Sequence, residues 1–95
     1  MKTGIELISE ERHKQIAKWG STDTHDINHE DFELSRAACA ISYKAPDDIQ
    51  TLIYAPDWAW ELRVKYVNDD IKKLQIAGAL IAAEIDRLNQ LKSNQ

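Results

Sequence analysis

The chain has 95 residues, with 16 acidic and 12 basic side chains and a formal net charge of −4. This length predicts one domain, residues 1–95, which buries only about 60–65 % of its unfolded surface. The acidic balance argues against a general nucleic-acid-binding protein, which usually carries a basic excess. The single cysteine, Cys39, excludes an internal disulfide, and its small neighbours predict a packed thiol.

No targeting or membrane segment is recognisable in the sequence. The first residues turn acidic too early for a signal peptide, and the longest apolar run, residues 76–83, is far shorter than a membrane span. We therefore expect a cytoplasmic location and no membrane partner.

The first predicted helix runs from about Gly4 to Lys18. Thr3, followed by Glu6 three residues later, forms a capping box, and Gly20 is a typical stop. Residues 21–28 are rich in turn formers and lack periodicity, so they predict a loop.

A second helix follows, with Asn28 as its cap and acidic residues, Glu30 and Asp31, in its first turn. It must end before Pro46, because the residue before a proline avoids the helical region. Its apolar stripe consists of Leu34, Ala37, Ala38 and Ile41.

The last half of the chain predicts a connector, residues 46–57, and two further helices. Asp57 caps the third, which reaches about Tyr66, and Asn68 caps the fourth. Because no Gly or Pro occurs between residues 57 and 77, one bent helix is the alternative.

The fourth helix carries an apolar series at 3–4 spacing and a run of small residues. The series is Ile71, Leu74, Gly78, Ile81, Ile85 and Leu88. The small residues of 77–83 let other helices approach closely, so we expect this helix to be central and packed on more than one side. No segment alternates with period two, so the fold class is an all-α bundle of three to four helices. Self-association, at least as a homodimer near residues 77–88, would complete the small core.

Glu84 falls inside an apolar stripe, where an unpaired carboxylate would cost several kcal/mol. Arg12 lies on a comparable stripe of the first helix. One interpretation is a structural Glu84–Arg12 pair. The other is a ligand-binding site that contains both residues.

The segment around the first loop gathers residues suited to metal chemistry. Glu30 and Glu33 share one helix face and predict a Mg²⁺ site, with Asp26 and His29 orienting a metal-bound water. Alternatives are zinc binding through the His25–His29 spacing, a phosphohydrolase pair formed by His25 and Asp26, or a solvated first helical turn.

Aromatic and basic residues cluster in the second half of the chain. Trp58 and Trp60 could stack on a base, and Lys72 and Lys73 could contact phosphates. The structural alternative is that both tryptophans fix the connector onto the core.

Together these segments resemble a family of small phage and prophage proteins described as MazG-like, after the all-α nucleoside triphosphate pyrophosphohydrolases. The residues that carry the resemblance are Ile8–Arg12, Gln15, Ile16, Trp19, His25, Asp26, His29, Glu33, Leu34, Ala37, Ala38, Tyr43, Pro56, Trp58 and Ala77–Leu88. The resemblance covers most of the chain, and the final dodecapeptide is its most specific part.

The resemblance implies Mg²⁺-dependent hydrolysis of a (deoxy)nucleoside triphosphate to monophosphate and pyrophosphate, in the cytoplasm of a bacterial host. Glu30 and Glu33 can serve as the family's Glu-x-x-Glu. Its later Glu-x-x-Asp is not present, since Val64 and Arg87 occupy the third position after Glu61 and Glu84. The alternative is a non-enzymatic anti-defence protein that sequesters a nucleotide signal or binds a host protein.

Overall fold

The computed structural model describes residues 1–19, 32–43 and 53–93. These residues form four helices: α1 (Gly4–Trp19), α2 (Glu33–Ser42), α3 (Asp57–Lys65) and α4 (Asp70–Ser93). No strand occurs in these three ranges. The expected all-α fold is confirmed, and its last two helices are separate rather than one bent helix.

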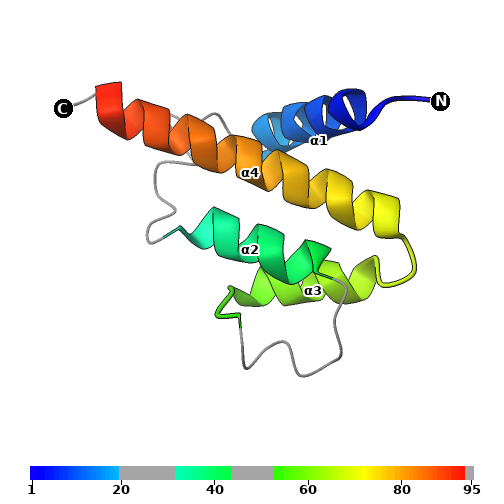
Figure 1. Ribbon diagram of the computed structural model, residues 1–95. Coiled ribbons are helices and arrows are strands. Elements are labelled where there is room, and N and C mark those ends of the chain that lie inside the picture. The colour runs from blue at the N-terminus through cyan, green and yellow to red at the C-terminus, as the bar shows by residue number, and fades with distance from the viewer. Residues whose placement is uncertain (20–31, 44–52, 94–95) are drawn as a thin grey trace.

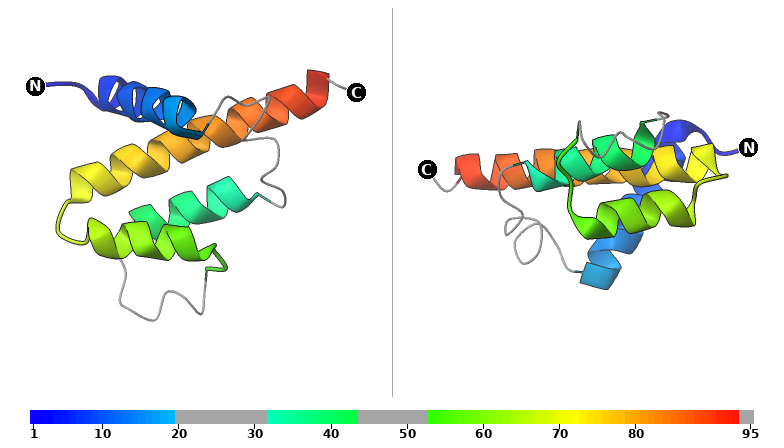
Figure 2. Two further views of the ribbon diagram at one scale, coloured as in Figure 1. Left: turned by 180° about the vertical axis from the view of Figure 1, so that it is seen from behind. Right: turned by 90° about the horizontal axis from the view of Figure 1, so that it is seen from below.

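The long helix α4 is the centre of the fold. It packs against α1 on one side and α2 on the other, and α3 packs beside α2 (Figure 1). Viewed from below, α1 crosses α4 steeply instead of running alongside it (Figure 2). The molecule measures 41 × 36 × 18 Å. A thickness of 18 Å is less than two helix diameters, so every helix keeps a face in water.

Local chemistry explains where the helices begin. Thr3 Oγ1 accepts the Glu6 N–H at 3.2 Å and Glu6 Oε1 accepts the Thr3 N–H at 3.1 Å, which confirms the capping box. At α4 the prediction was wrong by one residue, because Asp69 Oδ1, rather than Asn68, accepts the Lys72 N–H at 3.0 Å.

The start of α2 also differs from the prediction. The helix begins at Glu33, after Phe32 with φ 59°, so its first turn lies later than expected. Asn28, the predicted cap, lies outside the described residues. Phe32 offers no side-chain cap, which leaves the first N–H groups of α2 in need of partners.

Alanine dominates the core between α2, α3 and α4. The buried apolar residues are Leu34, Ala37, Ala38, Ala40, Ile41, Ala59, Ile76, Ala77, Leu80 and Ala83. Six of these ten are alanine, so backbones approach closely but each side chain removes little surface from water. Such a core stabilises the fold only modestly.

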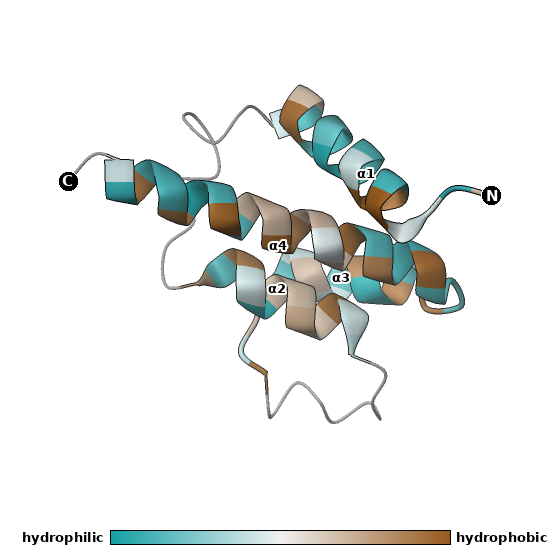
Figure 3. Cartoon of the chain, turned by 45° about the horizontal axis from the view of Figure 1, so that its top comes forward, coloured by the Kyte–Doolittle hydropathy of each residue, from teal (hydrophilic) through white to brown (hydrophobic). Residues whose placement is uncertain are grey.

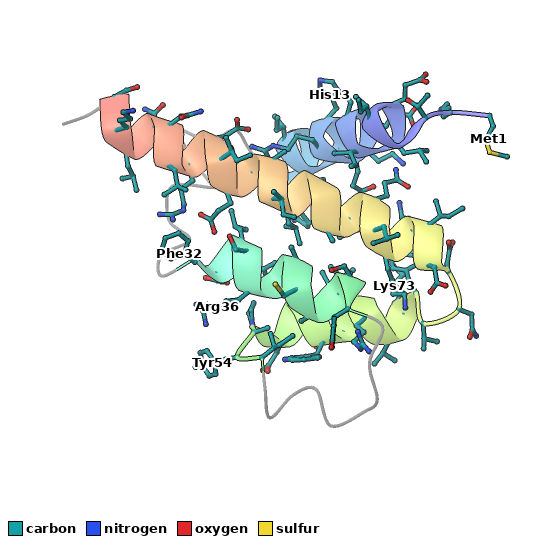
Figure 4. The ribbon with its side chains drawn as sticks, in the orientation of Figure 1. Met1, His13, Phe32, Arg36, Tyr54 and Lys73 are labelled. Carbon is teal, nitrogen blue, oxygen red and sulfur yellow. The ribbon has the colours of Figure 1, made fainter. Side chains whose placement is uncertain are left out.

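Polar contacts tie α3 to α2. Arg63 Nη1 donates to the Ala40 carbonyl at 2.9 Å and also to that of Tyr43, which satisfies the last turn of α2. Arg36 Nη1 donates to the Tyr54 carbonyl at 3.2 Å, and the two side chains lie together in Figure 4.

At Gly78, α1 packs tightly against α4. A Cβ at this position would lie 2.5 Å from Ile8 Cδ1 and 2.7 Å from Ile8 Cγ1. Gln75 Nε2 also donates to the Leu7 carbonyl at 3.0 Å. The small residue therefore serves a contact within the chain, as the predicted close packing requires.

Two burial predictions were wrong. Cys39 is exposed, although its neighbours Ala38 and Ala40 are buried. The large side chains of the 3–4 apolar series of α4 are exposed, although Gly78 packs on α1, because the alanine-rich face centred on Ile76 and Leu80 turns inward instead. Brown segments recur along α4 in Figure 3, which reflects a helix that is apolar on more than one face.

Candidate binding pocket

A pocket of about 660 Å³ opens between α1, α3 and α4. It is lined by Glu11, Lys14, Gln15, Lys18, Trp19, Leu34, Trp58, Glu61, Leu62, Lys65, Tyr66, Lys72, Ile76, Leu80 and Ala83. This volume lies in the range of small-molecule and cofactor sites. The apolar residues of α4 form one wall, and aromatic side chains from α1 and α3 form the others.

Positive charge gathers at the pocket although the whole chain is acidic. Four lysines and two glutamates line it, an excess of two positive charges in a chain of net charge −4. Lys72 Nζ pairs with Glu11 Oε2 at 3.0 Å. Within the described ranges, Lys14, Lys65 and Glu61 form no ion pair. The pocket therefore favours an anionic ligand.

Aromatic rings hold several of these lysines. Lys65 and Lys72 lie 5.4 and 5.8 Å from the centre of the Tyr66 ring, and Lys18 lies 5.1 Å from that of Trp19. Cation–π attraction favours such placements. The ammonium groups are thus kept beside rings that offer a stacking surface.

Gln15 is the most unusual residue of the pocket. Its exposed fraction is 5 %, yet its carboxamide hydrogen-bonds to no other described residue. No buried side-chain nitrogen or oxygen of the described residues lacks a hydrogen-bond partner, so the Gln15 amide atoms reach the open space of the pocket and are not enclosed in the core. A carboxamide provides two donors and an acceptor, which a ligand with a polar edge in the pocket would match.

Glu84 does not line the pocket. Its Oε2 accepts the Ser35 N–H at 3.1 Å and the Ser35 hydroxyl at 2.9 Å, and its Oε1 pairs with Arg87. Ser35 belongs to the first turn of α2, so Glu84 caps a helix that has no cap of its own and sits at its positive end. Glu84 and Arg87 are buried, with exposed fractions of 4 and 5 %, and Ser35 is half-buried.

The predicted Glu84–Arg12 pair is wrong. Arg12 instead donates to Asp86 Oδ2 from Nη2 at 3.0 Å and from Nε at 3.3 Å. The partners of Glu84 are Arg87, three residues along its own helix, and the backbone N–H and hydroxyl of Ser35 on α2. Arg12, like Glu84, lies outside the pocket lining.

The other predicted ligand-binding residues divide between pocket and core. Trp58 and Lys72 line the pocket. Trp60 does not, and its Nε1 donates to the Ala55 carbonyl at 3.2 Å. Lys73 is buried, pairs with Asp70 at 3.4 Å and extends from α4 toward the α2–α3 layer in Figure 4.

The predicted metal site is only partly described. Asp26, His29 and Glu30 lie outside the described residues, as does the alternative zinc ligand His25. Glu33 is described, and its Oε1 accepts the Trp58 Nε1–H at 3.2 Å at the edge of the pocket. In residues 1–19, 32–43 and 53–93, no group of three or more His, Cys, Asp and Glu side chains could hold a metal ion.

Sequence reasoning missed most of the lysines and Gln15. Lys14 and Lys18 are ordinary surface residues of α1, and only the crossing of α1 over α4 brings them near Lys65 of α3. The one local signal was Gln15, a polar residue between the apolar positions of α1.

Comparison with protein-family models, curated proteins and solved structures gives no match to this chain. Among the described helices, none is both long enough and apolar enough to cross a membrane.

Proposed function

We propose that this protein binds a nucleotide or nucleotide-derived anion in the pocket between α1, α3 and α4. The observation that carries the proposal is the combination, in one cavity of about 660 Å³, of several lysines, aromatic walls and the Gln15 carboxamide, whose polar atoms reach the pocket. The lysines are suited to phosphate groups, and the aromatic residues and the carboxamide are suited to a base.

The lysines supply the electrostatic part. Lys14 and Lys65 are not engaged in ion pairs within the described ranges, so their ammonium groups are available to phosphate oxygens. Hydrogen bonds to charged groups contribute about 1.5–3 kcal/mol each. Two such contacts would contribute about 3–6 kcal/mol to binding.

Trp58, Tyr66 and Gln15 supply the part that recognises a base. Trp58 of α3 and Tyr66, which directly follows α3, present aromatic surface to the pocket. Base–aromatic stacking contributes about 1–3 kcal/mol. The Gln15 carboxamide matches the alternating donors and acceptors of a base edge, which a purely apolar pocket would not.

Hydrolysis to monophosphate and pyrophosphate is the reaction that the sequence resemblance implies. The described residues supply one of the two predicted Mg²⁺ ligands, Glu33, and a single carboxylate does not form a metal centre by itself. The pocket therefore supports the proposal of nucleotide binding. Whether the bound nucleotide is hydrolysed or only sequestered is a question for experiment.

The test is a nucleotide panel with isothermal titration calorimetry, run with and without Mg²⁺, together with measurement of pyrophosphate release. We expect micromolar binding of at least one nucleoside triphosphate or related nucleotide. Pyrophosphate release that Glu33→Gln abolishes would support the hydrolase, and return of the intact ligand would support sequestration. No binding of any nucleotide would contradict the proposal and favour a protein partner.

A pair of charge-reversal variants ties binding to the pocket. Lys65→Glu should weaken nucleotide binding by roughly 100-fold, because a phosphate contact becomes a repulsion. Lys92→Glu makes the same charge change on an exposed residue outside the pocket lining and should change affinity little. Equal losses in both variants would show a general charge effect instead of a site.

A further inference from the structure

The indole of Trp58 lines the pocket from the first turn of α3, and a hydrogen bond ties it to the neighbouring helix. Its Nε1–H donates to Glu33 Oε1 at 3.2 Å, and Glu33 is the first residue of α2. A hydrogen bond to a carboxylate is roughly twice as strong as one between neutral groups. Because the indole N–H lies in the plane of the ring and favours a straight bond, the carboxylate fixes the direction of the ring as well as its position.

The orientation of this ring decides what the pocket offers to a base. Trp58 is half-buried: part of its side chain packs against the core between α2, α3 and α4, and part lines the pocket. An aromatic ring attracts a second ring in an offset stack or at its edge, so its contribution depends on the surface that it presents. A ring free to rotate would offer several orientations, of which only some stack on a base.

Glu33 is itself held in place by the start of α2. Helices α2 and α3 run in the same direction, so their first turns lie at the same end of the layer (Figure 1). The chain enters α2 through Phe32, whose φ is 59°. Two residues after Glu33, the Ser35 N–H and hydroxyl donate to Glu84 Oε2 at 3.1 and 2.9 Å. The first turn of α2 is thus fixed to α4, and Glu33 reaches Trp58 from that fixed turn.

We infer that Glu33 is a positioning residue, which holds the Trp58 indole in the orientation that stacks on the base of a bound nucleotide. The inference rests on the proposed nucleotide site. Glu33 does not itself line the pocket, so it acts through Trp58. This role needs no metal ion and differs from the Mg²⁺ ligation expected from the sequence.

This role separates the two halves of a nucleotide. Stacking on Trp58 acts on the base, whereas the lysines of the pocket act on the phosphates. Loss of the Glu33 acceptor should therefore weaken the binding of ligands that carry a base and spare inorganic triphosphate, which has none. Lys65→Glu is the comparison, because it removes a phosphate contact and should weaken the binding of both. General damage to the pocket would not produce this split.

Calorimetry without Mg²⁺ tests the inference, because metal ligation by Glu33 then contributes nothing to binding. The probes are ATP, GTP, CTP and UTP, with inorganic triphosphate as the base-free ligand. Glu33→Met keeps the length of the side chain and removes the acceptor, so it should weaken nucleotide binding roughly tenfold and leave inorganic triphosphate unchanged. Glu33→Gln retains a carbonyl oxygen and should lose less. Failure of the native chain to bind any of these nucleotides would remove the site on which the inference rests, whereas equal nucleotide affinity of the native chain and Glu33→Met would overturn this inference alone.

The indole N–H resonances of the tryptophans report the hydrogen bond directly by NMR, without any ligand. In Glu33→Met the Trp58 resonance should move and its N–H should exchange faster with water, because its acceptor is gone. Trp60 is the control within the same spectrum, since its Nε1 donates to the Ala55 carbonyl at 3.2 Å and should keep its resonance. An unchanged Trp58 resonance, or equal changes at both tryptophans, would overturn the inference.

A double-mutant cycle tests whether Glu33 acts through Trp58. Phenylalanine at position 58 keeps an aromatic ring but has no N–H, so Glu33→Met should cost no further nucleotide affinity in a Trp58→Phe background. An equal loss in both backgrounds would show that Glu33 acts by another route and would overturn the inference.

Discussion

Two largely buried polar residues on neighbouring helices differ in their hydrogen-bond partners. Glu84 is surrounded by partners: the Ser35 N–H and hydroxyl at the start of α2, and the Arg87 guanidinium. Gln15 is also only 5 % exposed, but it forms no hydrogen bond to the other described residues, and its amide atoms reach the open space of the pocket. The polar atoms of Glu84 are therefore occupied within the fold, whereas those of Gln15 are available to a ligand.

The comparison also assigns Glu84 to the fold and not to the pocket. Glu84 is conspicuous in the sequence as an acid inside an apolar stripe, and yet it acts as the missing cap of α2. The pocket instead is lined by residues that are inconspicuous in the sequence, such as Lys14 and Lys18. Helix capping thus explains why the charged side chain of Glu84 is buried.

The largest expected effect is on the Glu84 cluster. Glu84→Leu should lower the free energy of unfolding by about 3–5 kcal/mol, because it leaves Arg87 buried and unpaired. Glu84→Leu with Arg87→Leu should lose less than the sum of the single changes, since both charges are removed together. Urea unfolding monitored by circular dichroism measures both; additive losses would show that the two charges do not depend on each other.

The next effect concerns the α1–α4 contact. Gly78→Leu should destabilise the fold by about 1–3 kcal/mol, because its Cβ alone would clash with Ile8. Gly4→Leu is the control, since no atom lies within 4 Å of a Cβ there. Thermal unfolding of the two variants should differ clearly; equal melting temperatures would place α1 away from Gly78.

The smallest effect concerns the start of α1. Hydrogen bonds from the Thr3 backbone and side chain hold the pKa of Glu6 below its usual value of 4.5. Because the folded-state pKa is lowered, this carboxylate stabilises the fold above pH 4.5, and the contribution is lost as pH falls through the lowered value. Thr3→Val should move the Glu6 pKa, followed by NMR titration, back toward 4.5. An unchanged pKa would contradict the capping box.

The sequence predicted the features that depend on neighbours in the chain. The capping box joins residues three apart, and the four helices follow from periodicity and from prolines or caps at their ends. The class of fold follows from the same signals.

Features that depend on the packing of helices were not predictable in this way. Periodicity showed that α4 has apolar faces, but not that its alanine-rich face would turn inward and leave Ile81 and Ile85 exposed. The Glu84 cap depends on a backbone N–H of Ser35, which no side-chain pattern indicates. The pocket depends on how steeply α1 crosses α4 (Figure 2).

The most direct test is the nucleotide affinity of Gln15→Met, measured by calorimetry on protein whose stability has been checked. Methionine keeps the shape of the side chain and removes its polar atoms. We predict unchanged stability, because the Gln15 amide forms no hydrogen bond to the other described residues, and a roughly tenfold loss of affinity. Lower stability with unchanged affinity would contradict the account, because Gln15 would then serve the fold and not the ligand.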